Sequence, residues 1–512
     1  MGLQKVDMKY ILVAVFSIFL SQPASPADLT GRWVAETQAP NGEKRQTIFA
    51  FKSEGDKFTG YLVSTQGDDP IADGKVAGDT ISFVVIGDFY GQERRTEYTG
   101  RITADGLVIS AAGGRGGRGP RELLARRVST VAPTILPPAA KIALPPPATA
   151  VPGNALAKTP PMGWNSWNKF QRRVNDPVVR EVASAMAKNG MKDAGYVYVN
   201  IDDTWQGTRD AQGNIHANEK FPDMKALAGY VHGLGMKLGI YSSPGPRTCA
   251  GFEGSYQHEE QDAKTFAAWG IDYLKYDWCS ASRVFQLSSM PAVYAKMGQA
   301  LHDSGRPIVY SLCQYGMLNV GEWGPRAGGN LWRTTGDIRD AWASMTDLGF
   351  DKQAGLEKYS GPGHWNDPDM LEIGNGSMSL DEYRVHMSLW SILAAPLIAG
   401  NDLRDMPADI FAILANKEVI AVDQDALGKQ GVRVTKNGDL EVWSRPLAGG
   451  ALAVGLFNRG ADHAKVTARW SDLAISGSKN VRDLWAHADR GTASGEYSAD
   501  VASHGVVMLK LW

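Results

Sequence analysis

The stretch Tyr273-Leu-Lys-Tyr-Asp-Trp-Cys279 begins with apolar residues and ends in a charged pair and a cysteine. Residues two apart along a strand share a face, so Lys275, Asp277 and Cys279 are expected to point the same way. A lysine close to an aspartate favours the ionised carboxylate. The stretch is therefore predicted to be a short buried strand whose end carries either a nucleophile or a tightly bound salt bridge.

On both sides of this stretch, apolar strands that end in polar residues alternate with amphipathic helical stretches. Eight strands are predicted, at Met162–Trp167, Tyr196–Asp203, Lys237–Ser243, Tyr273–Cys279, Ile308–Gln314, Leu331–Asp337, His364–Leu371 and Pro396–Asp402. Helices are predicted between them, at Asp176–Asn189, Asp223–Leu234, Glu259–Trp269, Met290–Asp303 and Leu380–Leu393 among others. This number and spacing of units predicts an α/β fold, a (β/α)8 TIM barrel over residues 158–416.

The remaining segments have different compositions. Residues 1–27 place two lysines before an apolar run and small residues after it, which predicts a secretory signal peptide. Residues 28–129 alternate apolar and polar residues between turn signals, which predicts an N-terminal all-β domain, a sandwich or small barrel of roughly seven strands. Residues 130–157 are rich in proline and alanine and are expected to be an extended linker. Residues 417–512 return to short β runs and predict a C-terminal antiparallel β-sandwich.

Composition narrows the partners and the compartment. The chain has 512 residues and a net charge of −2, so no basic field favours nucleic acid. The early apolar run is short for a bilayer and no later stretch is long enough, so no membrane span is expected after signal cleavage. Three cysteines, Cys249, Cys279 and Cys313, allow one disulfide and one spare thiol and lack the spacing of a zinc site. A periplasmic or secreted protein is therefore predicted.

The active site of a TIM barrel lies at the C-terminal ends of the strands. The residues there are Trp164, Trp167, Asp202, Asp203, Tyr241, Lys275, Asp277, Cys279, Gln314, Tyr315, Arg333, Asp337, Asp367, Asp369 and Asp402. One acid at such an end is as easily a helix cap as a functional group. Carboxylates at so many ends, together with basic and aromatic residues, indicate a site.

Two ligand classes suit an acidic, aromatic-lined rim. Carboxylates bind divalent metal ions, but Lys275 and Arg333 would repel a cation. Sugar hydroxyls also bind carboxylates, and aromatic rings cover the apolar sugar face. Glycoside hydrolysis requires two carboxyl groups, for which Asp277 is the ionised candidate and Asp337 the proton donor. Arg333 lies four residues before Asp337 and favours its ionised form, so burial or a neighbouring carboxyl must offset it.

Several motifs occur in strand order, namely Pro160-Pro-Met-Gly-Trp-Asn-Ser-Trp167, Val199-Asn-Ile-Asp-Asp203, Gly239-Ile-Tyr241, Leu274-Lys-Tyr-Asp277, Trp332-Arg-Thr-Thr-Gly-Asp337 and Trp365-Asn-Asp-Pro-Asp-Met-Leu371. Residues 158–416 thereby resemble glycoside hydrolase family 27, the α-galactosidase and α-N-acetylgalactosaminidase family, also called melibiase. The C-terminal β-sandwich fits this family as well. The N-terminal β domain and the linker are not part of its common pattern.

The resemblance implies a retaining double displacement without metal or cofactor. Asp277 matches the family's nucleophile and Asp337 its acid/base, while Asp202 and Asp203 match the pair that binds the sugar's 4- and 6-hydroxyls. Substrate contacts are further implied for Trp167, Tyr241, Lys275, Cys313, Tyr315, Arg333 and Asp369. Cys249 and Cys279 match a disulfide beside the nucleophile.

The sequence departs from the family at a few positions. Thr204 stands where many members have a cysteine, and Gln314-Tyr315 stands where many have Glu-Trp. An aromatic residue at position 315 resembles the galactosidase form rather than the form that accepts an acetamide. Trp278 is bulkier than the common asparagine and is expected to narrow the site or shape an aglycone subsite.

The predicted function is hydrolysis of terminal α-linked galactose from oligosaccharides or polysaccharides. A β-L-arabinopyranosidase is an alternative, because that sugar is galactose without its hydroxymethyl group, but Asp202 as the 6-hydroxyl contact favours galactose. An α-N-acetylgalactosaminidase is disfavoured by the aromatic residue at 315. A non-catalytic sugar-binding protein is disfavoured by Lys275, Asp277 and Asp337. Binding of a polymer or a partner by the N-terminal β domain is a further alternative.

Overall fold

The computed structural model describes residues 27–38, 44–89, 91–112, 122–137 and 139–512. They form two compact units, and the second contains Pro137–Trp512 together with the short loops Thr65–Gly67 and Asp88–Glu93. The predicted signal peptide lies outside the described ranges, apart from Ala27. None of the helices in these ranges is long and apolar enough to cross a bilayer.

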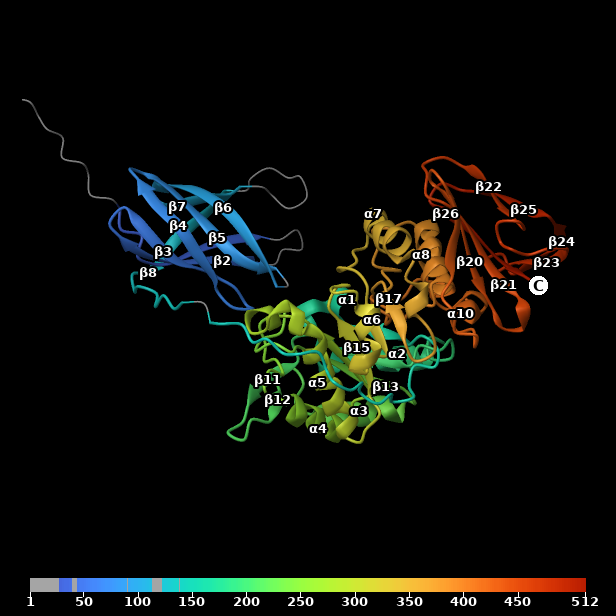
Figure 1. Cartoon of the computed structure of the whole chain (residues 1–512), viewed down its shortest axis with the longest axis horizontal. Helices are drawn as coiled ribbons and strands as arrows, with labels where there is room; N and C mark the ends of the chain where they lie inside the picture. The colour runs from blue at the N-terminus through green and yellow to red at the C-terminus, as the bar shows by residue number, and fades with distance from the viewer. Residues whose placement is uncertain (1–26, 39–43, 90, 113–121, 138) are drawn as a thin grey trace, which may run out of the picture. The chain divides into compact units, whose positions relative to one another are not determined.

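The N-terminal unit is a closed antiparallel barrel in which each strand pairs with the next and β8 returns to β1 (Figure 1). Its strands are β1 (Gly31–Gln38), β2 (Lys44–Glu54), β3 (Lys57–Val63), β4 (Asp69–Ala77), β5 (Thr80–Phe89), β6 (Gln92–Thr103), β7 (Gly106–Ala111) and β8 (Glu122–Ser129). The alternating apolar residues point inward, where Phe49, Phe51, Phe58 and Phe83 pack ring against ring. The all-β prediction is confirmed, with eight strands in place of about seven. An eight-stranded barrel encloses either side chains or one small ligand, and here buried apolar side chains form a core inside it.

The second unit is built around eight parallel strands, in the order β17-β16-β15-β14-β13-β10-β9-β18. They are β9 (Met162–Asn165), β10 (Tyr198–Asn200), β13 (Lys237–Ser242), β14 (Tyr273–Asp277), β15 (Val309–Cys313), β16 (Leu331–Arg333), β17 (Trp365–Asp367) and β18 (Leu397–Ala399). The sheet ends meet through a single parallel bridge between Leu371, just after β17, and Ala399 of β18. The predicted TIM-like barrel is confirmed.

Every predicted barrel strand is present, but most are shorter at the C-terminal end. The fourth strand, β14, ends at Asp277 and not at Cys279, and the second, β10, ends at Asn200 and not at Asp203. Hydrogen bonding to the neighbouring strand continues for one residue past each of these two ends, since the amides of Trp278 and Ile201 donate to Cys313 O and Gly239 O.

The helices agree closely with prediction. They are α2 (Asp176–Lys188), α3 (Met224–Gly233), α4 (Glu259–Trp269), α5 (Met290–Asp303) and α8 (Leu380–Ile392). Asn175 and Asp223 cap α2 and α3, and Ser379 with Glu382 forms a capping box on α8. The sequence pattern did not indicate the shorter elements, namely α1 (Trp167–Phe170), α6 (Val320–Trp323), α7 (Trp342–Thr346), α9 (Ala408–Leu414), α10 (Lys417–Asp423) and the hairpin of β11 (Gln206–Arg209) and β12 (Ile215–Ala217).

The proline-rich segment before the barrel is extended, and its second half is attached to the barrel. Ile142 forms a parallel bridge with Phe285, and the backbone amide of Val151 donates to Arg326 O at 2.9 Å. The Asn154 side chain donates to Asn330 Oδ1, at 2.8 Å, just before β16. This half of the segment is therefore part of the barrel's structure.

The C-terminal domain contains a six-stranded antiparallel sheet and a two-stranded one. Their strands are β19 (Val432–Asn437), β20 (Leu440–Pro446), β21 (Leu452–Asn458), β22 (Ala464–Arg469), β23 (Ser478–Asp483), β24 (Ala488–Ser494), β25 (Glu496–Val501) and β26 (Gly505–Leu511). One side of the large sheet shares a core with barrel residues through Trp443, Phe457 and Met508. The other side has its own core, around Val454, Leu456 and Trp470.

Candidate active site

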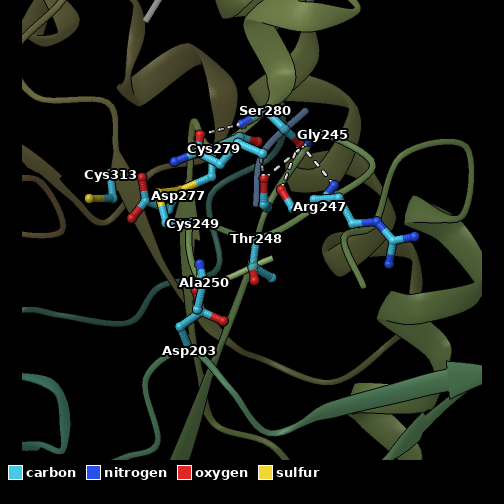
Figure 2. The surroundings of a disulfide bond; sticks show 12 residues. Asp203, Gly245, Arg247, Thr248, Cys249, Ala250, Asp277, Cys279, Ser280 and Cys313 are labelled. Atoms are coloured by element: carbon cyan, nitrogen blue, oxygen red, sulfur yellow. Dashed lines mark hydrogen bonds between the residues drawn. A yellow bond between two sulfur atoms is a disulfide. The ribbon is translucent and has the colours of Figure 1, made fainter. Parts of the chain in front are cut away.

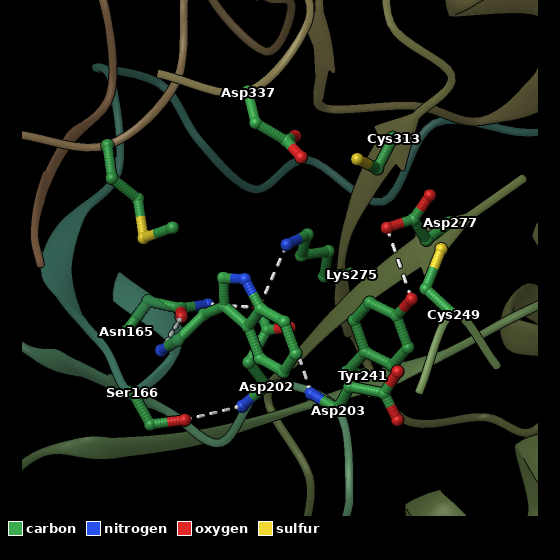
Figure 3. Close-up of polar contacts among 12 residues, drawn as sticks. Asn165, Ser166, Asp202, Asp203, Tyr241, Cys249, Lys275, Asp277, Cys313 and Asp337 are labelled. Atoms are coloured by element: carbon green, nitrogen blue, oxygen red, sulfur yellow. Dashed lines mark hydrogen bonds and ion pairs between the residues drawn. The ribbon is translucent and has the colours of Figure 1, made fainter. Parts of the chain in front are cut away.

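A cavity of about 630 Å³ lies at the C-terminal ends of the barrel strands. Most of the residues expected there line it, namely Trp167, Asp202, Asp203, Tyr241, Cys249, Lys275, Asp277, Tyr315, Arg333, Asp337 and Asp369. They come from seven of the eight strand ends, so the fold gathers side chains that are as much as 200 residues apart. Figure 3 shows Lys275, Asp277 and Asp337 facing one common space.

Asp277, the last residue of β14, is buried and is held by two tyrosine hydroxyl groups. Tyr315 donates to its Oδ1 at 2.6 Å, and Tyr241 donates to its Oδ2 at 3.1 Å. Burial raises the pKa of Asp277 to about 6, although Lys275 and the Tyr315 hydrogen bond act to lower it. The carboxylate is thus oriented through both oxygens and titrates near neutral pH.

Lys275 does not form its ion pair with Asp277. Its Nζ lies 2.8 Å from Oδ2 of Asp202, an oxygen that also accepts a hydrogen bond from Asn165 Nδ2 at 2.8 Å (Figure 3). Burial alone would lower the pKa of Lys275, but Asp202 and the other cavity carboxylates hold that pKa well above its usual value. The tightly bound salt bridge of Lys275 is therefore with Asp202, and within the described part of the chain Asp277 forms no direct ion pair.

Asp203 is tied to the disulfide loop. Cys249 and Cys279 are bonded, with Cα atoms 4.9 Å apart (Figure 2). The amide of Ala250, next to Cys249, donates to Asp203 Oδ2 at 2.7 Å. Burial nevertheless raises the pKa of Asp203 to about 6. The disulfide thus connects the end of β14 to a loop that orients a second carboxylate.

Arg333 links the remaining two carboxylates. Its Nη2 lies 3.0 Å from Asp369 Oδ2 and 3.3 Å from Asp337 Oδ1. Asp369 is buried at a backbone φ of +94°, a conformation that non-glycine residues rarely adopt outside functional sites. The Asp337 side chain is 70% exposed, so burial does not offset the effect of Arg333 on it. The closer partner of Arg333 is Asp369.

Three residues expected near the sugar lie elsewhere or point away. Trp278 is fully buried and stacks on Tyr294 at 5.8 Å, so the prediction that it narrows the site was wrong. Its amide still donates to Cys313 O of β15 at 3.0 Å, so its side chain takes the face opposite that of Asp277 and joins the core. Gln314 is also fully buried and bonds the backbone around it. Cys313 is a buried free thiol 3.8 Å from Arg333 Nη1 and does not line the cavity.

Two acids at strand ends have local roles. Asp367 accepts the amide of Asp369 at 2.8 Å and shapes the turn that places this residue. Asp402 pairs with Arg404 at 2.8 Å on the outside of the cavity. Both acids accept the backbone amide two residues further on and so fix local turns, and neither lines the cavity.

The cavity also contains residues that sequence reasoning missed. In addition to the predicted residues, loops beyond the strand ends line the cavity. Their residues include Asn168, Lys169, Gln171, Arg339, Asp340, Met370, Glu372 and Asn375. Glu372 is buried, which raises its pKa to about 7, and accepts hydrogen bonds of 2.5 Å from Asn168 and Asn375. Their positions a few residues past the predicted strand ends were the only available signal.

Comparison with known proteins agrees with this geometry. The family model described as "Alpha galactosidase A" matches residues 159–425, and "Alpha galactosidase C-terminal beta sandwich domain" matches residues 437–511. An alpha-galactosidase of Cyamopsis tetragonoloba is 49% identical over 364 residues, which are 70% of this chain and 87% of the relative. An alpha-galactosidase A of Cellvibrio japonicus is 48% identical, over 70% of this chain and 92% of the relative.

Several solved structures are also similar to this chain. Alpha-galactosidase I from Mortierella vinacea is 39% identical with a TM-score of 0.67, covering 70% of this chain and 98% of that one. A GH27 β-L-arabinopyranosidase from Geobacillus stearothermophilus is 27% identical with a TM-score of 0.63, covering 70% of this chain and 97% of that one. A protein from Bacteroides fragilis covers 96% of this chain and 95% of its own, at 31% identity and a TM-score of 0.67.

Proposed function

The chain belongs to the alpha-galactosidase family, and from this premise we propose how its cavity hydrolyses terminal α-galactosyl residues. The observation that carries the proposal is the pair of carboxyl groups from different strand ends in one cavity. Asp277 is buried and oriented through both oxygens, whereas Asp337 is exposed to the cavity. A retaining glycosidase requires such a pair, one carboxylate as nucleophile and one as acid and then base.

The reaction has two displacements at the anomeric carbon. In the first, an oxygen of Asp277 bonds to that carbon while the leaving-group oxygen takes a proton from Asp337. In the second, Asp337 removes a proton from water, and the water oxygen displaces Asp277 from the carbon. Each displacement inverts the configuration, so the product keeps the α configuration of the substrate.

The other cavity residues bind the sugar. Asp202 and Asp203, which are fixed by Lys275 and by the Ala250 amide, accept hydroxyl hydrogen bonds from the 4- and 6-positions of galactose. The Trp167 ring covers the apolar face of the sugar ring. Arg333 and Asp369 bind further hydroxyl groups. Tyr315, an aromatic residue, leaves less room for an acetamide than a small residue would.

The compartment is part of the proposal. The predicted signal peptide directs the chain to the periplasm or outside the cell. The Cys249–Cys279 disulfide is consistent with such an oxidising compartment. The natural substrates are then extracellular or periplasmic oligosaccharides or polysaccharides with terminal α-linked galactose.

A panel of chromogenic glycosides tests substrate choice. The α-galactoside is expected to have a higher kcat/KM than the β-L-arabinopyranoside or the α-N-acetylgalactosaminide. A higher kcat/KM for the β-L-arabinopyranoside would instead identify the enzyme as a β-L-arabinopyranosidase. Failure to cleave any of the three would favour a non-catalytic sugar-binding protein.

Azide rescue tests the two carboxylate roles separately. In Asp337→Ala, azide attacks the β-linked glycosyl-enzyme, and α-galactosyl azide is expected. In Asp277→Ala, azide attacks the substrate directly, and β-galactosyl azide is expected. The assignment fails if the two variants give azides of the opposite configurations, or if either variant hydrolyses the galactoside as fast as the unaltered enzyme.

A further inference from the structure

We propose that Tyr315, held in place by Gln314, is a positioning residue that orients Asp277 and keeps it ionised in the free enzyme. The inference rests on the proposed role of Asp277 as nucleophile and goes beyond it, because Tyr315 was expected only as a bulky residue beside the sugar. It gives a physical reason for Gln314-Tyr315, the pair at which this sequence departs from its family.

The contact with Asp277 is direct. The Tyr315 hydroxyl donates to Oδ1 at 2.6 Å, the shorter of the two hydrogen bonds from tyrosine that Asp277 accepts. Hydrogen bonds to an ionised carboxylate are shorter and stronger than neutral ones. Since Tyr241 binds only Oδ2, loss of the Tyr315 hydroxyl would leave the carboxylate plane fixed from one side.

The backbone around Tyr315 is built to hold this ring. Tyr315 has a φ of +60°, a left-handed conformation that costs free energy in a tyrosine and must be supported by its surroundings. The support comes from Gln314, which is fully buried and bonds on both sides of the turn. Its Nε2 donates to Arg333 O at 3.0 Å, and its Oε1 accepts the amide of Gly316 at 2.8 Å.

This pair of bonds requires an amide side chain. A glutamate carboxylate would accept from the Gly316 amide but has no hydrogen to donate to Arg333 O. Gly316 is likewise constrained, because a Cβ there would lie 2.3 Å from Thr334 O. The Arg333 guanidinium lies over the Tyr315 ring, 5.8 Å from its centroid. The turn therefore sets where the hydroxyl points.

The charges around Asp277 explain why a donor matters there. The titratable groups that act on it are Asp202, Tyr241, Lys275, Tyr294, Cys313, Tyr315 and Asp337. Lys275 is paired with Asp202, and its charge still favours the ionised form of Asp277, more strongly than the Tyr315 hydrogen bond does. Burial and the charge of Asp337 both disfavour ionisation. The Tyr315 hydroxyl is thus the closest group that favours the charged form.

The test compares the pH dependence of kcat/KM for an α-galactoside in four forms of the full-length enzyme. These are the unaltered enzyme, Tyr315→Phe, Gln314→Leu and the double variant. The control is Tyr359→Phe, which removes a hydroxyl that donates to Glu322, at 3.0 Å, away from the cavity. Thermal unfolding of each form shows that it is folded under the assay conditions.

In Tyr315→Phe the acid limb of the kcat/KM profile is expected to move to higher pH by roughly one to two units. The reason is that a hydrogen bond to the ionised Asp277 carboxylate is lost. kcat/KM above the limb is expected to fall roughly tenfold or more, because the carboxylate is less well oriented. Gln314→Leu should shift the limb in the same direction by less. The double variant should match Tyr315→Phe, since Gln314 acts through Tyr315.

Two results would overturn the proposal. One is an acid limb in Tyr315→Phe that coincides with that of the unaltered enzyme and of Tyr359→Phe. The other is a double variant whose shift is the sum of the two single shifts. The variant Asp277→Ala distinguishes a failure of the Tyr315 proposal from a failure of the proposed function. If Asp277→Ala keeps full activity, the nucleophile assignment fails; if it is inactive, an unmoved limb counts only against Tyr315.

Discussion

At the scale of single residues, the burial of Asp277 predicts the pH dependence of the reaction. Its pKa is raised from the ordinary 3.8 to about 6, and only the ionised carboxylate is a nucleophile. The kcat/KM of the free enzyme should therefore be half-maximal near pH 6 and fall roughly tenfold for each pH unit below it. A profile of kcat/KM from pH 4 to pH 8 measures this, and an acid limb centred near pH 4 would contradict it.

The same shift predicts that ionised Asp277 destabilises the folded state. A carboxyl whose pKa is raised in the folded state stabilises it fully below pH 3.8, and this stabilisation is lost as pH rises through about 6. Asp277→Asn mimics the protonated form at every pH. At pH 7.5 it should raise the free energy of unfolding by about 3 kcal/mol. Thermal unfolding at pH 7.5 and pH 4 checks this, since the gain should nearly vanish at pH 4.

Residue identities were more predictable than residue partners. The sequence placed Asp202, Asp277 and Asp337 at strand ends, and all three line the cavity. It could not show that Lys275 reaches across to Asp202, because that contact depends on the curvature of the closed barrel. Nor could it show the positive φ of Tyr315 or Asp369, since few non-glycine residues adopt it, even among aspartates, where it is more common.

At the scale of elements, the strand and helix patterns were reliable and their ends were not. The alternation of Lys275 and Asp277 holds because both lie within β14. It was extended to Cys279, and the Cys279 sulfur still lies within 4.8 Å of an Asp277 carboxylate oxygen although the strand has ended. The helix bounds agreed better because capping side chains such as Asn175 mark them in the sequence.

The disulfide loop gives a prediction at this scale. Replacing Cys249 and Cys279 by serine frees the loop that carries Ala250, whose amide orients Asp203. Closing a loop of this length contributes about 3 to 4 kcal/mol in the chain-entropy description. The double variant should unfold at a lower temperature, and its KM for an α-galactoside should rise more than its kcat falls. The matched control is Cys313→Ser, which alters the buried free thiol and leaves the disulfide intact.

A KM unchanged in the disulfide variant would show that Asp203 keeps its place without the loop. The same conclusion would follow if dithiothreitol lowered the unfolding temperature but left KM as it was. Either result would limit the disulfide to stability and would leave the orientation of Asp203 to the Thr204 amide, which donates to its Oδ1 at 2.6 Å.

At the scale of the whole molecule, composition predicted the order of the domains. It did not predict how either barrel closes. Nothing in the sequence marks the bridge from Leu371 to Ala399 that completes the catalytic barrel. The alternating runs of the N-terminal domain fit a sandwich as well as a closed barrel, because both bury every second residue. Proline content identified an extended segment before the barrel and gave no sign that part of it is anchored.

That anchored segment supports the last prediction. Val151 is 8% exposed, and Asn154 donates to Ile308 O and Asn330 Oδ1, each at 2.8 Å. Burial of one valine and two hydrogen bonds are together worth about 3 to 5 kcal/mol. A truncated chain that begins at residue 158 should therefore unfold at a lower temperature than one that begins at residue 137, since only the longer chain keeps these contacts.

The two truncated chains should share one kcat at low temperature. Asn154 contacts residues that precede β15 and β16, opposite the cavity, and Ile142 pairs with Phe285, which follows β14 but does not line the cavity. In the full-length protein, Asn154→Ala should lower the unfolding temperature, and Val131→Ala, at a residue 77% exposed, should not. Equal unfolding temperatures for the two truncated chains would mean that residues 137–157 are only a spacer. A lower kcat in the shorter chain would mean that their contacts reach the catalytic end of the barrel.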